Sequence, residues 1–239
     1  MLRDDPKVAI NNIKIENDFI TEVEAEYLLS KVYAAPKPKW VQLKNRRLQL
    51  YGCQYLKRND NKAEINQQKE TQLPMIKEEF PIWLEKISQR ISNFLRGIGV
   101  DMVPNQCLIN EYFPNQGIFR HNDGPAFKPM ICTLSLGEYT ILNFFDTNKF
   151  EDLELTSDFP STKVYLPKNS LVFISEDAYL KNLHSIDDFG EDFINKNDKI
   201  INFDFSNENE THYLKKTNTR VSLTFRIAKN VVKNNFFKF

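Results

Sequence analysis

Three consecutive residues, His121-Asn122-Asp123, have the types and spacing of a metal site. Residues i and i+2 of a strand point to the same face, so the imidazole of His121 and the carboxylate of Asp123 can reach one ion. Two histidines and one carboxylate form the facial triad typical of non-haem Fe(II), which leaves three coordination positions open. A lone His-x-Asp also arises by chance, so it needs support from elsewhere. The third ligand has to come from another element, where His184 and His212 are the candidates.

A strand predicted over residues 219–228 carries two arginines on one face. Its alternation places Arg220, Ser222, Thr224 and Arg226 on one side and Val221, Leu223, Phe225 and Ile227 on the other. Arginines between apolar neighbours need anions as partners, and the planar guanidinium matches a carboxylate bidentately. This face therefore favours a dicarboxylate that chelates iron at one end and meets an arginine at the other. The alternative is a solvated edge strand with surface arginines.

A second strand adds hydrogen-bond donors to the same predicted pocket. Asn110 and Tyr112 share a face of the strand expected near residues 106–112. Both side chains can donate a hydrogen bond to a carboxylate. The alternative is an ordinary strand with a half-buried tyrosine.

Short strands are the elements that must position these residues. Period-two alternation predicts them near residues 106–112, 118–121, 131–136, 139–145, 163–166, 171–174 and 219–228. Many short strands separated by turn signals favour a double-sheet roll. Residues 187–212 are mostly Asp, Glu, Asn and Lys, so we expect a long surface loop there.

Two helices are expected before the strands. Thr21 and Glu24 fit a capping box at the start of the first helix, which should end before Pro36. The second helix should begin near Pro81, since proline suits a first helical turn. Both helices are expected to pack on one sheet of the roll.

The composition is that of one domain with a sizeable core. The chain has 239 residues, of which 41% are hydrophobic. Only seven glycines are present, which disfavours glycine-rich phosphate-binding folds. Three cysteines lie far apart without a CxxC pair, as in a reduced intracellular protein rather than a disulfide framework or a zinc knuckle. No signal peptide or membrane-spanning apolar run is recognised, so we expect cytoplasm or nucleus.

The net charge is zero, but basic residues are concentrated in the N-terminal part of the sequence and acidic residues in the C-terminal half. Residues 31–62 carry nine basic side chains against one acidic, whereas residues 146–210 carry fifteen acidic and six basic. The basic stretch also contains aromatic residues, and together they suggest a lid that faces nucleic acid through Trp40, Arg46, Arg47 and Tyr51. The alternative is a surface hairpin with solvated charges.

The ordered set of motifs resembles the AlkB dioxygenases, most of all their sixth-homologue branch. Asn110-x-Tyr112, His121-x-Asp123, a distal His184 and a pair of arginines six positions apart, Arg220 and Arg226, follow one another in the family's order. The segments 110–118, 121–125, 133–137 and 219–224 match around these motifs, and 43–52 resembles the lid. The resemblance covers residues 10–230.

The resemblance implies a complete set of iron ligands. His121, Asp123 and His184 would bind Fe(II), because the family places its distal histidine after a strand and well before the arginine strand. His212 would then be a solvated bystander in the acidic segment.

The resemblance also implies the binding residues for 2-oxoglutarate. Asn110, Tyr112 and Arg220 would hold this cosubstrate, with Arg220 on its distal carboxylate. Arg226 would lie near the iron-side carboxylate, and Ser222 would add a hydrogen bond.

The reaction implied by the resemblance is an oxidative demethylation. O₂ and 2-oxoglutarate would be consumed, succinate and CO₂ released, and an N-methyl group hydroxylated and lost as formaldehyde. The expected substrate is an alkylated nucleic acid, either DNA or RNA. Two alternatives remain: the same chemistry on a protein side chain, as a hydroxylase or demethylase, and a cupin-like binding module without turnover.

The expected fold is α+β and mainly β: a double-stranded β-helix, or jelly roll, with the N-terminal helices packed on one sheet. Residues 1–239 would form a single dioxygenase domain. In it, residues 1–104 would hold the helices and the lid, and residues 105–230 the catalytic core with the acidic insert 187–212. We expect a monomer without a membrane partner.

Overall fold

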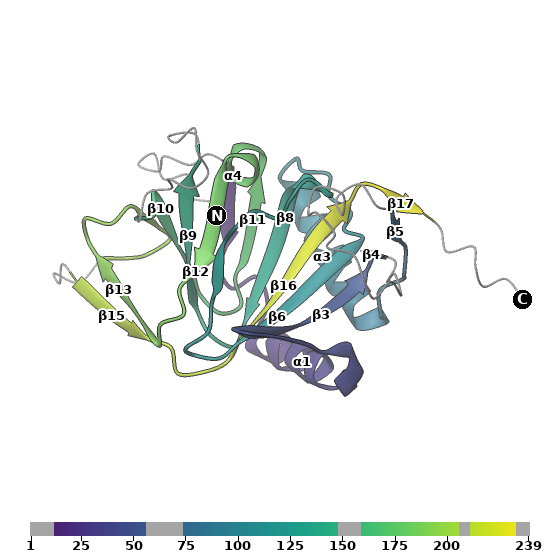
Figure 1. The fold of residues 1–239 in the computed structure, drawn as a ribbon, viewed down its shortest axis with the longest axis horizontal. Coiled ribbons are helices and arrows are strands. Elements are labelled where there is room, and N and C mark those ends of the chain that lie inside the picture. Colours follow the sequence, from purple (N-terminus) through teal and green to yellow (C-terminus); the bar gives the residue numbers. More distant parts are fainter. Residues whose placement is uncertain (1–11, 56–73, 148–158, 206–210, 233–239) are drawn as a thin grey trace, which may run out of the picture.

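The computed structural model describes residues 12–55, 74–147, 159–205 and 211–232, and most of their strands lie in two facing β-sheets (Figure 1). The larger sheet has seven strands in the order β1 (Ile13–Glu16), β11 (Leu171–Ser175), β8 (Phe127–Leu136), β16 (Arg220–Ala228), β6 (Gln106–Tyr112), β3 (Arg46–Gly52) and β2 (Val41–Leu43). The smaller has five, in the order β14 (Ile200–Ile201), β10 (Thr162–Leu166), β9 (Thr140–Asp146), β12 (Asn182–Ile186) and β7 (Ile118–His121).

The chain crosses repeatedly between the two sheets, as in a jelly roll. From β6 to β16, the strands β6, β8, β11 and β16 belong to the larger sheet, and β7, β9, β10 and β12 to the smaller. The predicted double-stranded β-helix is confirmed. Each of the seven strands expected from the sequence is present, with ends shifted by up to four residues.

Alternation along β16 shows how the sequence builds this fold. All nine of its residues are buried, because both faces of the strand are covered. Val221, Leu223 and Phe225 point to the core between the larger sheet and the helices. The arginine face points the other way, into the space between the two sheets. A polar face buried in this way is expected to have a function.

The two predicted helices cover the outer face of the larger sheet. Helix α1 (Glu22–Tyr33) begins at Thr21 with the predicted capping box, in which Glu24 N donates to Thr21 Oγ1 over 3.3 Å. Helix α3 (Ile82–Gly97) follows Pro81. The core joins the two helices to the sheet through Leu28, Val32, Leu84, Ile91, Ile109, Leu134 and Leu223. None of the helices in the described ranges has the length and hydropathy of a membrane span.

Residues 187–212 differ from the long loop that we expected. They contain β13 (Glu191–Asn195), β14 and the start of β15 (Thr211–Lys215), and β13 pairs with β15 in a separate two-stranded sheet. This small sheet lies at the left end of the molecule in Figure 1. The polar composition of this segment made these strands unrecognisable in the sequence, because only alternate residues such as Ile194 are buried in a core.

His212 is not the solvated residue that we expected. It lies on β15, and its ring packs edge-on against Phe203 at 5.2 Å and Phe205 at 5.7 Å between ring centroids. No local pattern indicated this packing, because the two phenylalanines come from a segment predicted as loop.

Side-chain contacts close one side of the jelly roll. Asn17, which follows β1, and Asn202, which follows β14, donate to each other's side-chain oxygens over 2.9 Å. Ile15 and Ile201 pack in the same apolar cluster beneath that seam. The strands at the opposite edges of the two sheets are β2 and β7. Among the described residues, no strand joins β2 to β7, so the described part of the chain leaves the space between the sheets open on that side.

Candidate active site

A pocket lies between the two sheets, and all the residues predicted to bind iron or 2-oxoglutarate line it. They are Asn110, Tyr112, His121, Asp123, His184, Arg220, Ser222 and Arg226. Strands β6 and β16 supply the cosubstrate residues from the larger sheet, and β7 and β12 supply the two histidines from the smaller. The structure thus brings together residues that are up to 116 positions apart in the sequence, from Asn110 to Arg226.

Strands β7 and β12 bring the two histidines side by side. His184 is paired with His121 across these strands, and their ring centroids are 4.4 Å apart. Ile186 pairs with Ile118. The segment from Ile118 to His121 on β7 is thus one residue longer than the segment from His184 to Ile186 that pairs with it on β12, which is a β-bulge. The bulge turns Ile118 and His121 to the same pocket although their spacing is odd. His184 lies within β12, after β11 and before β16 as the resemblance implied.

Asp123 reaches the same point from outside the strand. Strand β7 ends at His121, so the predicted placement of both ligands on one strand was wrong. Asp123 instead lies in the turn that follows, where Gly124 has a φ of +79° and Gly124 N donates to Asn122 Oδ1 over 3.0 Å. This turn returns the carboxylate toward the pocket.

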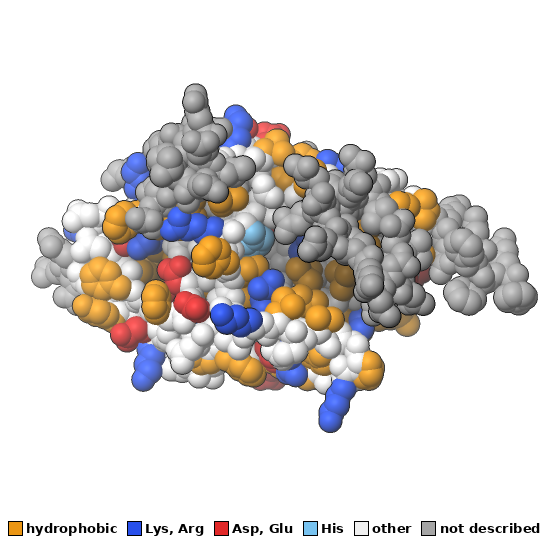
Figure 2. Space-filling model, in the orientation of Figure 1, with side chains coloured by type: hydrophobic (Ala, Val, Ile, Leu, Met, Phe, Trp, Pro, Cys, Tyr) orange, Lys and Arg blue, Asp and Glu red, His pale blue; other side chains and the backbone are white. Residues whose placement is uncertain are grey.

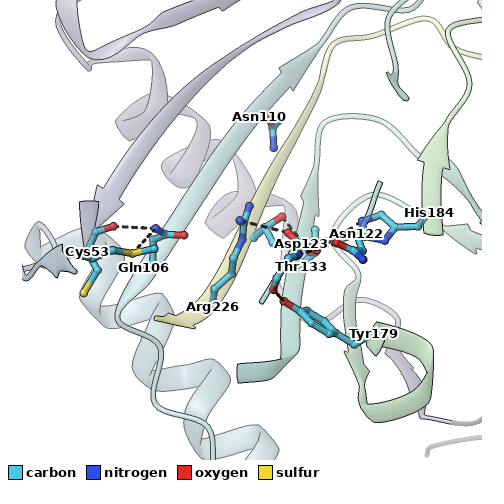
Figure 3. Close-up of polar contacts among 12 residues, drawn as sticks. Cys53, Gln106, Asn110, Asn122, Asp123, Thr133, Tyr179, His184 and Arg226 are labelled. Carbon is cyan, nitrogen blue, oxygen red and sulfur yellow. Dashed lines mark hydrogen bonds and ion pairs between the residues drawn. The ribbon is translucent and has the colours of Figure 1, made fainter. Parts of the chain in front are cut away.

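Two side chains converge on the Asp123 carboxylate from opposite sides (Figure 3). Asp123 Oδ2 lies 3.6 Å from His184 Nε2, and Asp123 Oδ1 lies 3.3 Å from an Arg226 guanidinium nitrogen. Burial alone would raise the pKa of Asp123, but the nearby charges of Arg226, His184 and His121 outweigh it and lower the pKa. The carboxylate is therefore ionised at neutral pH, as a metal ligand must be.

His184 has the protonation state that a metal ligand needs. Burial lowers the pKa of His184 to about 4, so its imidazole is neutral at physiological pH. His121 Nδ1 lies 2.8 Å from the carbonyl oxygen of Phe119. A proton on Nδ1 would be donated to that carbonyl and would leave Nε2 free as a ligand.

The donor set fits iron, although the side chains lie slightly too far apart for coordination. Over the described residues, no three His, Cys, Asp or Glu side chains are close enough to hold a metal ion as they stand. Ligands about 2.1 Å from an ion and at right angles to each other are about 3 Å apart. The 3.6 Å between His184 and Asp123 therefore requires a contraction of only a few tenths of an ångström. Two neutral imidazoles and one carboxylate on one wall suit Fe(II) with open positions.

Arg220 is a buried cation without an anion. Its guanidinium donates to Ser135 Oγ over 3.0 Å and lies over the Tyr112 ring at 5.6 Å. Arg220 is 5% exposed and forms no ion pair with a carboxylate of the described residues, and its Nε has no hydrogen-bond partner there. Burial lowers the pKa of Arg220 to about 10, so the side chain is still charged at neutral pH. Such a charge favours an anionic ligand in the pocket.

The four predicted lid residues lie on two different faces of the sheet. Arg46 Nε donates to Asn110 Oδ1 over 3.1 Å, which places Arg46 on the pocket face of β3. Arg47 instead pairs with the buried Glu111 and lies 4.1 Å from the centroid of the Trp40 ring. Tyr51 packs edge-on against Trp83 of α3, 5.9 Å between ring centroids. Trp40, Arg47 and Tyr51 therefore face the helices, and of the four only Arg46 faces the pocket.

Three contacts at the site were missed by sequence reasoning. Tyr179 OH, from α4 (Glu176–Leu180), donates to Gly124 O over 2.9 Å and so supports the turn that carries Asp123. Ser135 and Thr133 share a pocket-facing side of β8, and Thr133 lines the pocket. Alternation along β8 could have indicated Ser135 and Thr133, whereas nothing near Tyr179 in the sequence points to the site.

The comparisons with known proteins agree with this geometry. The family described as the 2OG-Fe(II) oxygenase superfamily matches residues 14–226. The Danio rerio protein described as probable RNA/DNA demethylase ALKBH6 is 32% identical over 231 residues, which cover 92% of this chain and 87% of the relative. The chain belongs to the AlkB family within this superfamily. It is therefore an Fe(II)- and 2-oxoglutarate-dependent dioxygenase that consumes O₂.

Two further comparisons extend the match. Uncharacterized protein L905 of Acanthamoeba polyphaga mimivirus is 28% identical over 225 residues, which cover 94% of this chain and 87% of the viral protein. The solved structure of OsALKBH1 superposes with a TM-score of 0.55 at 14% identity, covering 95% of this chain and all of that one. At that identity, the OsALKBH1 match supports the fold alone.

Proposed function

We propose that this AlkB-family dioxygenase demethylates alkylated nucleic acid, with release of formaldehyde, succinate and CO₂. A relative with 32% identity is described as a probable RNA/DNA demethylase, which supports this substrate class. The proposal covers both DNA and RNA.

One observation carries the mechanism: a buried arginine, without a carboxylate partner among the described residues, shares a pocket with two histidines and an aspartate. Arg220 supplies the cation for the distal carboxylate of 2-oxoglutarate. His121, Asp123 and His184 supply the neutral and anionic donors for Fe(II). Fe(II), once bound with O₂ and 2-oxoglutarate, supplies the oxidant that hydroxylates a substrate N-methyl group.

The remaining pocket residues orient the cosubstrate and the metal ligands. Asn110 and Tyr112 lie across from β16, where Ser222 pairs with Asn110 and Arg220 with Tyr112. Their side chains can donate to the carboxylates of 2-oxoglutarate. Arg226 holds Asp123 by an ion pair, and its charge would also lie near the iron-side carboxylate of a bound cosubstrate.

The test of the reaction is product formation by the full chain with Fe(II) and 2-oxoglutarate. Succinate and formaldehyde should form in equal amounts with N-methylated oligonucleotides, and methylated peptides should give neither above background. If succinate and formaldehyde formed in equal amounts with methylated peptides and not with oligonucleotides, the substrate would be a protein and not a nucleic acid. Absence of 2-oxoglutarate turnover under all conditions would contradict the assignment of the site.

The iron ligands are tested with a matched pair of histidine variants. His184→Ala should abolish tight Fe(II) binding, measured by titration with the absorbance of the Fe(II)–2-oxoglutarate complex. His212→Ala, which removes an imidazole packed against Phe203 and Phe205, should leave Fe(II) affinity unchanged. Loss of iron in the His212 variant alone would overturn the proposed ligand set.

A further inference from the structure

The open side of the jelly roll has one wall formed by the edge strand β7. Phe119 on β7 is 90% exposed, the highest value among the large hydrophobic residues of the described chain. Its carbonyl oxygen lies 2.8 Å from His121 Nδ1, so the position of Phe119 is coupled to a proposed iron ligand. The bulge that turns Ile118 and His121 inward lies in the same segment of β7. It leaves Phe119 pointing outward beside the pocket.

Among the described residues, no ring contact accounts for the exposed side chain of Phe119. Edge strands are normally protected by charged residues or proline, because bare hydrophobic edges promote aggregation. Phe119 has no ring partner among the described aromatic residues, whereas its neighbour Arg120 packs over Phe145 at 3.8 Å. The aromatic face of Phe119 is therefore available to a ligand.

The facing wall comes from β2 and β3. Val41 pairs with Leu48 and Leu43 with Arg46, so these four residues share one face. That face is the pocket face, because Leu48 pairs with Asn110 of β6. Val41 is 50% and Leu43 37% exposed, which makes this wall apolar with one cation.

The charges around the opening suit a polyanion. Figure 2 shows a histidine side chain at the centre of this face, with hydrophobic and basic side chains around it. Acidic side chains are also visible to the left of the histidine, and the exposed Asp187 and Asp188 follow Ile186, which pairs with Ile118 of β7. The basic part of the rim is therefore on the side of β3, where Arg46 lies. A cationic, aromatic and apolar rim is the pattern that binds single-stranded nucleic acid, since bases stack on the rings and phosphates meet the cations.

We propose that Phe119 stacks on a nucleobase adjacent to the modified one, and that the rim formed by Phe119, Val41, Leu43 and Arg46 therefore takes an unpaired strand. In a duplex, both faces of an internal base are covered by its neighbours, so Phe119 could not stack without first disrupting the helix. This proposal rests on the proposed function, because it assigns the strand type and a recognition residue to the same site.

The test compares variants of the full chain on an N-methylated single-stranded oligonucleotide and on its duplex. Base stacking on an aromatic residue corresponds to roughly a 5- to 100-fold change in affinity. Phe119→Ala should therefore raise the KM for the single strand roughly 5- to 100-fold with a much smaller change in kcat. Phe119→Trp should restore the KM. Phe193→Ala removes a half-exposed phenylalanine of β13 and should match the wild type.

A fluorescent base reports the contact directly. With 2-aminopurine next to the methylated base, binding should quench fluorescence in the wild type and in Phe119→Trp but not in Phe119→Ala. An unchanged KM together with undiminished quenching in Phe119→Ala would overturn the proposal, as would an equal or lower KM for the duplex. Binding and quenching without demethylation would instead refute the proposed function and leave the stacking contact standing.

Discussion

Replacement of Arg220 with methionine should have opposite effects on the stability of the ligand-free protein and on its response to 2-oxoglutarate. Methionine has a similar length and no charge, so it removes the buried cation and leaves little empty space. The guanidinium donates to Ser135 and lies over Tyr112, but it has no carboxylate partner in the described chain. The ligand-free protein therefore carries an uncompensated charge in its interior.

The size of this cost follows from the pKa of Arg220, which burial lowers from 12.5 to about 10. At about 1.4 kcal/mol per pKa unit, folding disfavours the charged form by about 3 kcal/mol. Because the folded pKa lies below the unfolded one, the cost applies in full at neutral pH and fades only as pH rises through about 10. Loss of the contacts with Ser135 and Tyr112 offsets about 1 to 2 kcal/mol of the gain. Arg220→Met should thus stabilise the ligand-free protein by roughly 1 to 2 kcal/mol, or about 2 to 8 °C in Tm.

The effect on 2-oxoglutarate should be the reverse. Removal of one partner from a buried charge pair costs about 2 to 5 kcal/mol, so the Kd for 2-oxoglutarate should rise about 30- to 5,000-fold. Wild-type protein at 100 times its Kd gains about 2.7 kcal/mol from the ligand, whereas the variant should gain almost nothing.

Thermal denaturation with and without 2-oxoglutarate, in the presence of a redox-inert divalent metal, measures both effects. Arg220→Lys is the control, because lysine keeps the positive charge but lacks the planar guanidinium that binds a carboxylate through two hydrogen bonds. A variant Arg220→Met that melts below the wild type, or that keeps its ligand-induced shift, would refute the reasoning.

Three further variants test the elements around the site. Arg47→Ala should destabilise the fold by about 3 kcal/mol in urea unfolding, because it leaves the buried Glu111 carboxylate without its cation, and adding Glu111→Leu should recover most of the loss. Thr21→Ala should cost about 1 kcal/mol in the same assay through the lost helix cap, without any change in Fe(II) affinity. Gly117→Ala should weaken Fe(II) binding, because the new Cβ would lie 2.2 Å from Ile186 O and force β7 away from β12; unchanged iron affinity would contradict this.

Much of the fold was predictable because its signals are local. The capping box at Thr21 depends on four adjacent residues, and it was confirmed. The strand around Arg220 was predicted to within one residue, because its alternation extends over nine positions. Where alternation was obscured by polar residues, as around Ile194, the strand was missed.

The site was predictable in its members but not in its geometry. The residue types at His121, Asp123 and Arg220 carried the chemistry, and their roles as ligands stay predictions for the experiments above. The bulge in β7 and the turn after His121 could not be foreseen, since both depend on how β7 pairs with β12. Nothing local to Tyr179 indicates that it supports the turn at Gly124.

The sequence by itself determined the seven predicted strands, the helix cap and the polar face of β16, because each depends on residues a few positions apart. The resemblance favoured His184 over His212, and the tertiary structure supplies the physical reason: His184 lies on a strand beside His121, whereas His212 lies on β15 among phenylalanines. Tertiary structure alone decided that Arg47 pairs with Glu111 while Arg46 and Phe119 lie at the open side. These outcomes depend on contacts between strands far apart in the chain, and no local pattern encodes which strands will become neighbours.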